Sequence, residues 1–137
     1  MTTRPDDLTA FQRPNSPNTA LYAPAGLSLE NETDGTVPTY PKSVADLSKV
    51  ACKVWGNLKN VKLTEMVEDG FRLSRFVATT PVLRFKDDIT VQFVSMENDH
   101  SSFIIYSASR IGYSDFGTNK KRVEDWLYRL NEAVRGA

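Results

Sequence analysis

The sequence has one cysteine, one histidine and no long apolar run. The single Cys52 excludes an intramolecular disulfide and a cysteine-based zinc cluster, and the single His100 excludes a cluster of histidine ligands. No run approaches the length needed to span a bilayer, and the first ten residues, MTTRPDDLTA, lack the apolar core of a secretion signal. We therefore expect a cytoplasmic protein with no membrane span.

An excess of charge of either sign is also missing, because 17 basic and 17 acidic side chains cancel. Proteins that bind nucleic acid or anionic membranes without specificity usually carry a basic surplus, so the balanced net charge argues against both as partners. With 137 residues, the chain is long enough for one domain with a sizeable core.

Proline is concentrated in residues 1–42, where it disfavours long helices and a central strand. Apolar side chains are nevertheless interspersed along this segment, unlike in a disordered tail. They are Phe11, Leu21, Tyr22, Leu27, Leu29, Val37 and Tyr40. We expect an extended arm of residues 1–42 that docks on a single α+β domain of residues 43–137, over the sheet face that the helices leave bare.

Two amphipathic helices are predicted. The first begins at Ser43, which forms a pattern resembling a capping box with Asp46, and the second begins at Thr118 or Asn119, either a competent N-cap. Apolar residues recur at helical spacing in both. In the second helix they are Val123, Trp126, Leu127, Leu130 and Val134. This stripe is expected to pack on a sheet.

Four strands are predicted between the helices. Val61 begins the first, the acidic turn 68–70 leads into the second, and a slip of the apolar phase near Ser74 suggests a bulge. The third strand is predicted from residues of one parity, which are Leu83, Phe85, Ile89, Val91 and Phe93. The fourth, residues 102–110, is apolar on both faces and is therefore expected to be central. The predicted fold is α+β, a four-stranded antiparallel meander with two helices on one face and an extended N-terminal arm.

A basic segment follows the fourth strand. Gly112 and Gly117 allow backbone angles closed to other residues, and one or both of them are expected at positive φ. Three cations then stand in the first helical turn, where the helix dipole favours anions. Two interpretations are open. One is a solvated basic turn with a structural pair between Arg110 and Asp115. The other is an anion-binding helix N-terminus formed by Arg110, Asn119, Lys120, Lys121 and Arg122.

Residues 106–122, YSASRIGYSDFGTNKKR, followed by Trp126 and Leu127, resemble the bacterial and plastid family named domain of unknown function 1499. Residues 13–18 and 83–89 resemble two further segments of that family, and the resemblance spans residues 13–130. Ala108 and Thr118 depart from it, standing where many relatives carry arginine and valine. The family supplies no activity, and its members often carry an export or membrane leader, which would change the expected compartment. The candidate structural-motif residues are Arg13, Asn15, Asp87, Asp88, Gly112, Asp115 and Gly117.

Catalytic motifs are incomplete. Thr118 and Asn119 stand where a phosphate loop that used Gly112 and Gly117 would need lysine and then serine or threonine. Serine nucleophiles lack a base, because His100 is the only histidine. We therefore expect neither an enzyme nor a cofactor.

The acidic pair Asp87 and Asp88 is not expected to bind a metal. The two residues are adjacent on a predicted strand, so their side chains point to opposite faces and supply too few oxygen ligands for a hard cation. We expect them to pair with Arg84, Lys86 or Arg110 instead.

Two functional hypotheses follow. The first is a non-catalytic module that binds a small anion, an acidic headgroup or a carboxylate, and a pocket beside Arg110 would favour it. The second is a structural or protein-interaction module that uses the arm and the sheet face. An exposed apolar sheet face or a shared arm would favour the second. An enzyme based on carboxylates and tyrosines is a weaker third hypothesis, which loss of turnover on substitution of Asp87 or Asp115 would support.

Overall fold

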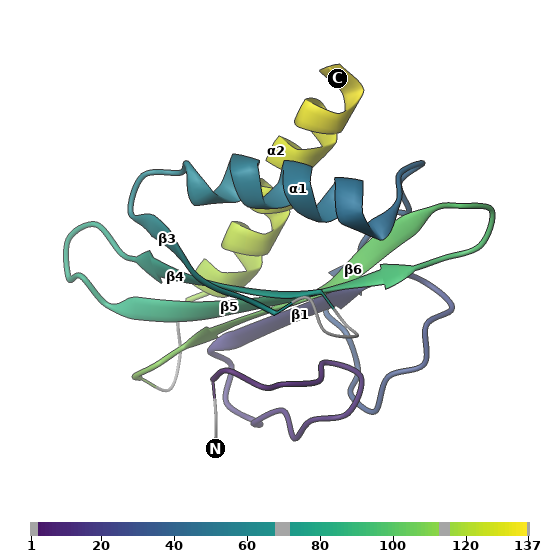
Figure 1. Cartoon of the computed structure of the whole chain (residues 1–137). Helices are drawn as coiled ribbons and strands as arrows, with labels where there is room; N and C mark the ends of the chain where they lie inside the picture. The colour runs from purple at the N-terminus through teal and green to yellow at the C-terminus, as the bar shows by residue number, and fades with distance from the viewer. Residues whose placement is uncertain (1–2, 68–71, 113–115, 137) are drawn as a thin grey trace.

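The computed structural model of the protein describes residues 3–67, 72–112 and 116–136. Two helices and six strands follow in the order β1 (Thr19–Ala23), β2 (Gly35–Thr36), α1 (Val44–Gly56), β3 (Val61–Val67), β4 (Leu73–Thr79), β5 (Lys86–Ser95), β6 (Ser101–Ser109) and α2 (Thr118–Gly136). The strands form one sheet in the order β2-β1-β6-β5-β4-β3. Figure 1 shows both helices on one side of this sheet and the N-terminal segment on the other.

The prediction of a four-stranded antiparallel sheet was wrong. β3 to β6 do form an antiparallel meander, but β1 adds to β6 in antiparallel orientation and β2 adds to β1 in parallel orientation. Both extra strands come from residues 1–42, where no central strand was expected. The five buried residues of β1 fit between Pro17 and Pro24, so no proline interrupts the ladder. β6 lies between β1 and β5, which confirms that it is central.

Aromatic side chains fill the space between the sheet and the helices. The Trp55 ring of α1 lies 5.1 Å from Trp126 of α2 and 5.5 Å from Phe103 of β6, measured between ring centroids. Trp55 Nε1 also donates a hydrogen bond to the Trp126 carbonyl oxygen at 3.0 Å. The two predicted helices therefore share one core, and Ser43 caps α1 as expected by accepting from the Asp46 amide.

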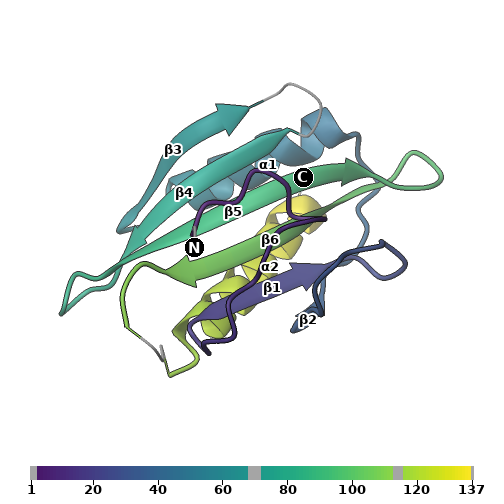
Figure 2. The same ribbon diagram turned by 90° about the horizontal axis from the view of Figure 1, so that it is seen from below.

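Residues 3–11 lie on the opposite face of the sheet. Leu8 is fully buried, and its amide donates to Gln92 Oε1 of β5 at 2.7 Å. Phe11 meets the Tyr106 ring of β6 edge-on at 4.8 Å between centroids. Figure 2 shows this segment crossing β5 and β6. The division of the chain into an arm and a domain at residue 42 stays a prediction.

The turn between β4 and β5 differs from the predicted strand. β5 begins at Lys86, so Leu83 and Phe85 lie outside it and are 68% and 43% exposed. Arg84 between them has φ 57°, a left-handed conformation that interrupts the strand. The alternating apolar pattern was therefore misleading at these two positions.

Two smaller predictions concern the hairpin of β3 and β4. The bulge was expected on β4, but the register shift lies between Leu63 and Glu65 of β3, because β4 also pairs without interruption along β5. The predicted turn at residues 68–70 falls outside the described residues.

Candidate functional site

Two adjacent aspartates of β5 organise the polar contacts at one end of the sheet. Asp87 and Asp88 are 2% and 1% exposed, and their side chains point to opposite faces because they are consecutive on a strand. Asp87 faces α2, where its Oδ2 lies 2.8 Å from Arg122 Nη2. Asp88 faces the other way and pairs with Arg110. Two cations that were predicted to share a site are therefore held on opposite faces of the sheet.

Arg110 and Asp88 form a bidentate ion pair. Arg110 Nε donates to Asp88 Oδ2 at 3.0 Å, and Nη2 donates to Oδ1 at 2.8 Å. Thr3 adds a third donor to Asp88 Oδ2 at 2.6 Å. The hydrogen bond to Asp88 raises the pKa of Arg110, which keeps the guanidinium charged. The alternative partner Asp115 lies outside the described residues.

Asn119 is fully buried at the start of α2. Its Nδ2 donates to the Asn18 carbonyl oxygen and to Ser109 Oγ, both at 2.9 Å. Its Oδ1 accepts from Arg122 Nη1 at 2.9 Å and from Ser107 Oγ. These bonds join α2 to the end of β6 and to the segment before β1, so Asn119 and Arg122 have structural partners. No pattern in the sequence indicates that Asn18, Ser107 and Ser109 belong to this site, since a lone polar residue has no periodic signal.

The remaining residues of the predicted helix N-terminus face solvent. Lys120 and Lys121 are exposed on the first turn of α2. Gly112 and Gly117 have φ values of 87° and 82°, which confirms the expected left-handed conformations. The Gly112 carbonyl oxygen accepts from Asn18 Nδ2 at 2.7 Å, so this turn also contacts the N-terminal segment.

Arg13 holds the N-terminal segment together. Its guanidinium pairs with the Asp34 carboxylate and donates to Thr19 Oγ1 at 3.1 Å. Asn15 is exposed and, with Arg13 and Lys120, lines a hollow of about 570 Å³. Three carboxylates also line this hollow, those of Glu30, Glu32 and Asp34. Its charge does not favour an anion.

A second pocket, of about 420 Å³, lies beside Arg110, where β4 and β6 end and β5 begins. We call it the basic pocket; its lining residues are Asn60, Val61, Lys62, Thr64, Val77, Thr79, Arg84, Lys86 and Arg110. Four of these residues are basic and none is acidic. Within the described part of the chain, no ion pair involves Lys62, Arg84 or Lys86. Positive charge is therefore concentrated here with one direct carboxylate partner, Asp88.

The local backbone positions these cations. Two hydrogen bonds between Thr80 and Phe85 close the β4–β5 turn. The Thr80 amide donates to the Phe85 carbonyl oxygen, and Thr80 Oγ1 accepts from the Phe85 amide, both at 2.8 Å. This turn holds Arg84 at its positive φ, a conformation that costs free energy in a residue other than glycine. Lys86 begins β5 and donates from Nζ to Thr79 Oγ1 at 3.3 Å. In the sequence, Arg84 and Lys86 were recognised only as partners for the aspartates.

Comparison with protein families agrees with the resemblance described above. A family model described as a protein of unknown function, DUF1499, matches residues 8–130. The chain belongs to the DUF1499 family. No curated protein gives a significant match to it. The matched region includes the basic pocket and both aspartates of β5.

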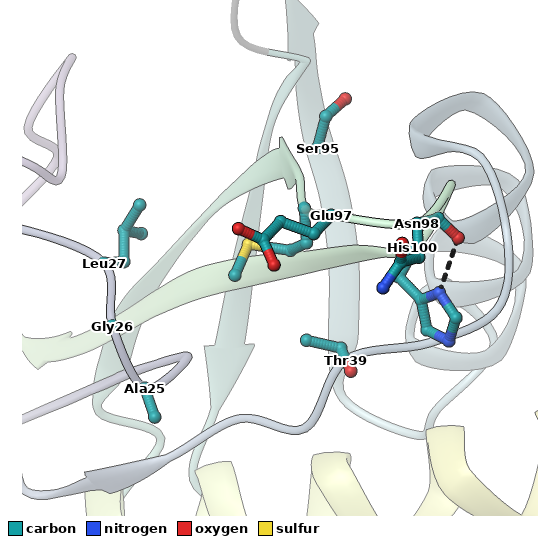
Figure 3. Close-up of a pocket in the computed structure, with 9 residues that line it drawn as sticks. Ala25, Gly26, Leu27, Thr39, Ser95, Glu97, Asn98 and His100 are labelled. Atoms are coloured by element: carbon teal, nitrogen blue, oxygen red, sulfur yellow. Dashed lines mark hydrogen bonds between the residues drawn. The ribbon is translucent and has the colours of Figure 1, made fainter.

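The other end of the sheet in this DUF1499 protein has a pocket of about 650 Å³, shown in Figure 3. It is lined by Ala25, Gly26, Leu27, Thr39, Ser95, Met96, Glu97, Asn98 and His100. His100 Nδ1 lies 2.9 Å from the Asn98 carbonyl oxygen. The Glu97 carboxylate and the His100 ring point to opposite sides in Figure 3, so the two do not form an acid–base pair.

The residues that the structure describes contain no group of three histidine, cysteine, aspartate or glutamate side chains that could hold a metal ion. None of the helices they form is long and apolar enough to cross a membrane.

Proposed function

We propose that the basic pocket binds a small anion, either a phosphate or a carboxylate group. The observation that carries the proposal is the lining of the pocket, with four cationic side chains and, for Lys62, Arg84 and Lys86, no carboxylate partner in the described chain. Like charges held close together repel one another, and a bound anion would relieve that repulsion. Lysine and arginine are the usual protein ligands for such groups.

Arg110 is suited to a fixed role in this pocket. Asp88 accepts from its Nε and Nη2, which orients the guanidinium, and Nη1 takes part in none of the hydrogen bonds described for it. A preorganised arginine loses less conformational entropy on binding than a free one. The hydroxyl groups of Thr64 and Thr79, which also line the pocket, supply neutral donors.

The proposed site differs from the predicted helix N-terminus. It keeps Arg110 but replaces Asn119, Lys120, Lys121 and Arg122 with Lys62, Arg84 and Lys86. Asn119 and Arg122 are less suitable because their polar atoms already bond to Ser107, Ser109 and Asp87. Lys120 and Lys121 are exposed, and the hollow that Lys120 helps to line also has three carboxylates.

Phosphate titration of the full chain tests this proposal. Isothermal titration calorimetry and thermal unfolding at fixed ionic strength would compare wild type with the double variant Arg84→Gln/Lys86→Gln. We expect inorganic phosphate to stabilise wild type, by roughly 2.7 kcal/mol at a concentration near 100 times its dissociation constant. The double variant should bind at least about tenfold more weakly, a loss of roughly 1.4 kcal/mol.

Two control variants keep the test specific. Lys49→Gln removes an exposed charge of α1 outside the pocket, and Lys120→Gln/Lys121→Gln removes the exposed pair of α2. Both controls should retain phosphate binding. Equal phosphate affinity in wild type and in Arg84→Gln/Lys86→Gln would reject the basic pocket. A loss confined to Lys120→Gln/Lys121→Gln would return the site to the helix N-terminus.

The alternative of an interaction module built from the arm and the sheet face has less support. Such a module needs an exposed apolar sheet face, but the helices cover one face and residues 3–11 contact the other. That interaction would require the arm to leave the sheet and expose Leu8 and its neighbours.

A further inference from the structure

Five large apolar side chains are exposed at the same end of the sheet as the basic pocket. We call them the apolar tips; they are Val82, Leu83, Phe85, Ile111 and Phe116. The most exposed are Val82, at 88%, and Phe116, at 91%. Figures 1 and 2 both place the β4–β5 turn and the end of β6 at one end of the sheet. The Arg110 amide donates to the Lys86 carbonyl oxygen at 3.2 Å, so the two segments that bear the tips are neighbours.

The fold does not account for the exposure of these side chains. A strand extended to residue 83 would have kept Leu83 and Phe85 in phase with the buried Ile89, Val91 and Phe93. The turn instead carries Leu83 and Phe85 outward, with Arg84 held at positive φ between them. A cluster of exposed apolar residues on a small protein usually marks a contact surface.

Cations alternate with the apolar tips. Arg84 lies between Leu83 and Phe85, and Arg110 directly precedes Ile111. Both arginines also line the basic pocket. The partner of this surface must therefore offer apolar groups and negative charge within a side-chain length of each other.

We infer that this end of the molecule docks on the surface of an anionic phospholipid bilayer. The inference rests on the proposed anion-binding function and names its ligand as a lipid headgroup phosphate. In a bilayer, the headgroup phosphates lie next to the acyl chains, and the basic pocket and the apolar tips lie next to each other at one end of the sheet. Apolar side chains that enter the interface and cations that reach lipid phosphates reinforce one another.

The shape of the surface favours a bilayer over a folded protein partner. The tips lie on two separate segments, whereas the concavity beside them is lined by four basic side chains and no acidic one. A helix-binding groove would have the reverse arrangement, with an apolar floor and a charged rim. A fluid interface accommodates separate projecting side chains without a complementary shape.

The buried tryptophans allow a direct test of insertion. Trp55 and Trp126 are 0% and 2% exposed, so a tryptophan introduced at a tip would be the side chain that reaches lipid. Leu83→Trp would be compared with Tyr128→Trp, which replaces an aromatic residue of α2 that is 64% exposed and outside the tips. The vesicles would contain phosphatidylcholine with about one third phosphatidylserine, and bromine-labelled acyl chains as quencher.

The expected result is quenching of the Leu83→Trp fluorescence and no added quenching in Tyr128→Trp. In sedimentation with the same vesicles, Val82→Ser/Leu83→Ser should weaken binding at least about tenfold while phosphate binding stays intact. Arg84→Gln/Lys86→Gln should weaken both. Vesicles of phosphatidylcholine alone should bind wild type at least about tenfold more weakly than anionic ones.

Four outcomes would overturn the inference. Wild type that binds phosphate but no anionic vesicle would leave the proposed function standing and reject the bilayer as partner. Vesicle binding unchanged in Val82→Ser/Leu83→Ser would show that the tips do not insert. Equal quenching at positions 83 and 128 would show an unspecific orientation. Absence of both phosphate and vesicle binding would reject the proposed function along with the inference.

Discussion

The two faces of the sheet are built from the same strands but are stabilised differently. On the helix-covered face, Trp55, Phe76, Phe103 and Trp126 form a chain of ring contacts with centroid distances of 5.1 to 5.9 Å. On the arm-covered face, the apolar cluster is small and lies beside buried polar side chains. These are Arg75, Asp88, Thr90 and Gln92.

Because of this difference, we expect the two faces to respond differently to substitutions. Burial of aromatic area is non-directional and tolerates small shifts, whereas buried polar groups are costly unless each bond is made. Arg75 illustrates the second case, because its guanidinium donates to the Pro5 carbonyl oxygen at 3.0 Å and pairs with Asp6 and Glu65. The arm therefore completes the polar face, and loss of the arm would leave buried groups without partners.

The largest effect is expected for Trp126→Ala on the helix-covered face. The side chain is 2% exposed and contacts both Trp55 and Phe76. Its truncation should lower the free energy of unfolding by roughly 3 to 5 kcal/mol. Urea denaturation followed by circular dichroism measures this change. A midpoint close to that of wild type would mean that the aromatic contacts do not dominate this face.

Arg122→Ala should destabilise the protein by roughly 3 kcal/mol, since it leaves the buried Asp87 without its cation. Repulsion among three cations in the first turn of a helix would by itself predict that loss of any of them is neutral or slightly stabilising without ligand. That expectation now applies only to Lys120 and Lys121. Arg110→Ala provides the comparison across the sheet, and its effect should be smaller because the Arg110 side chain is 38% exposed. Similar losses of unfolding free energy in the two variants would remove this distinction between the faces.

The smallest effect is expected for Leu8→Ala on the arm-covered face. Leu8 is fully buried, but it lies near the chain end, where the structure can relax around a cavity, so a loss near 2 kcal/mol is expected. Limited proteolysis should show faster cleavage within residues 1–30 in the variant. Leu29→Ala is the matched control, because Leu29 is only partly buried against the same cluster. An unchanged cleavage rate in Leu8→Ala would indicate that the polar contacts alone hold the arm.

Several features of the fold and the site were predictable because their signals are local. Ser43 and the apolar stripe of α1 identified the first helix, and the two-sided apolar pattern of β6 identified the central strand. Pairing of Asp88 with Arg110 was among the expected ion pairs. By contrast, nothing local in the sequence indicates that Arg122 pairs with Asp87, which lies 35 positions earlier in the chain.

The two helices, the antiparallel meander of β3 to β6 and membership in the DUF1499 family could be predicted without the structure, because periodicity, capping and a long specific motif are local features of the chain. Tertiary structure decided that β1 and β2 complete the sheet, that Arg110 and Arg122 lie on opposite faces, and that Leu83 and Phe85 stay exposed. Each of these depends on which distant segment supplies a neighbour. The free energy of the whole packed structure decides which strand pairs with an edge, which cation pairs with a buried carboxylate and which conformation a turn adopts. None of these outcomes leaves a repeating pattern in the sequence.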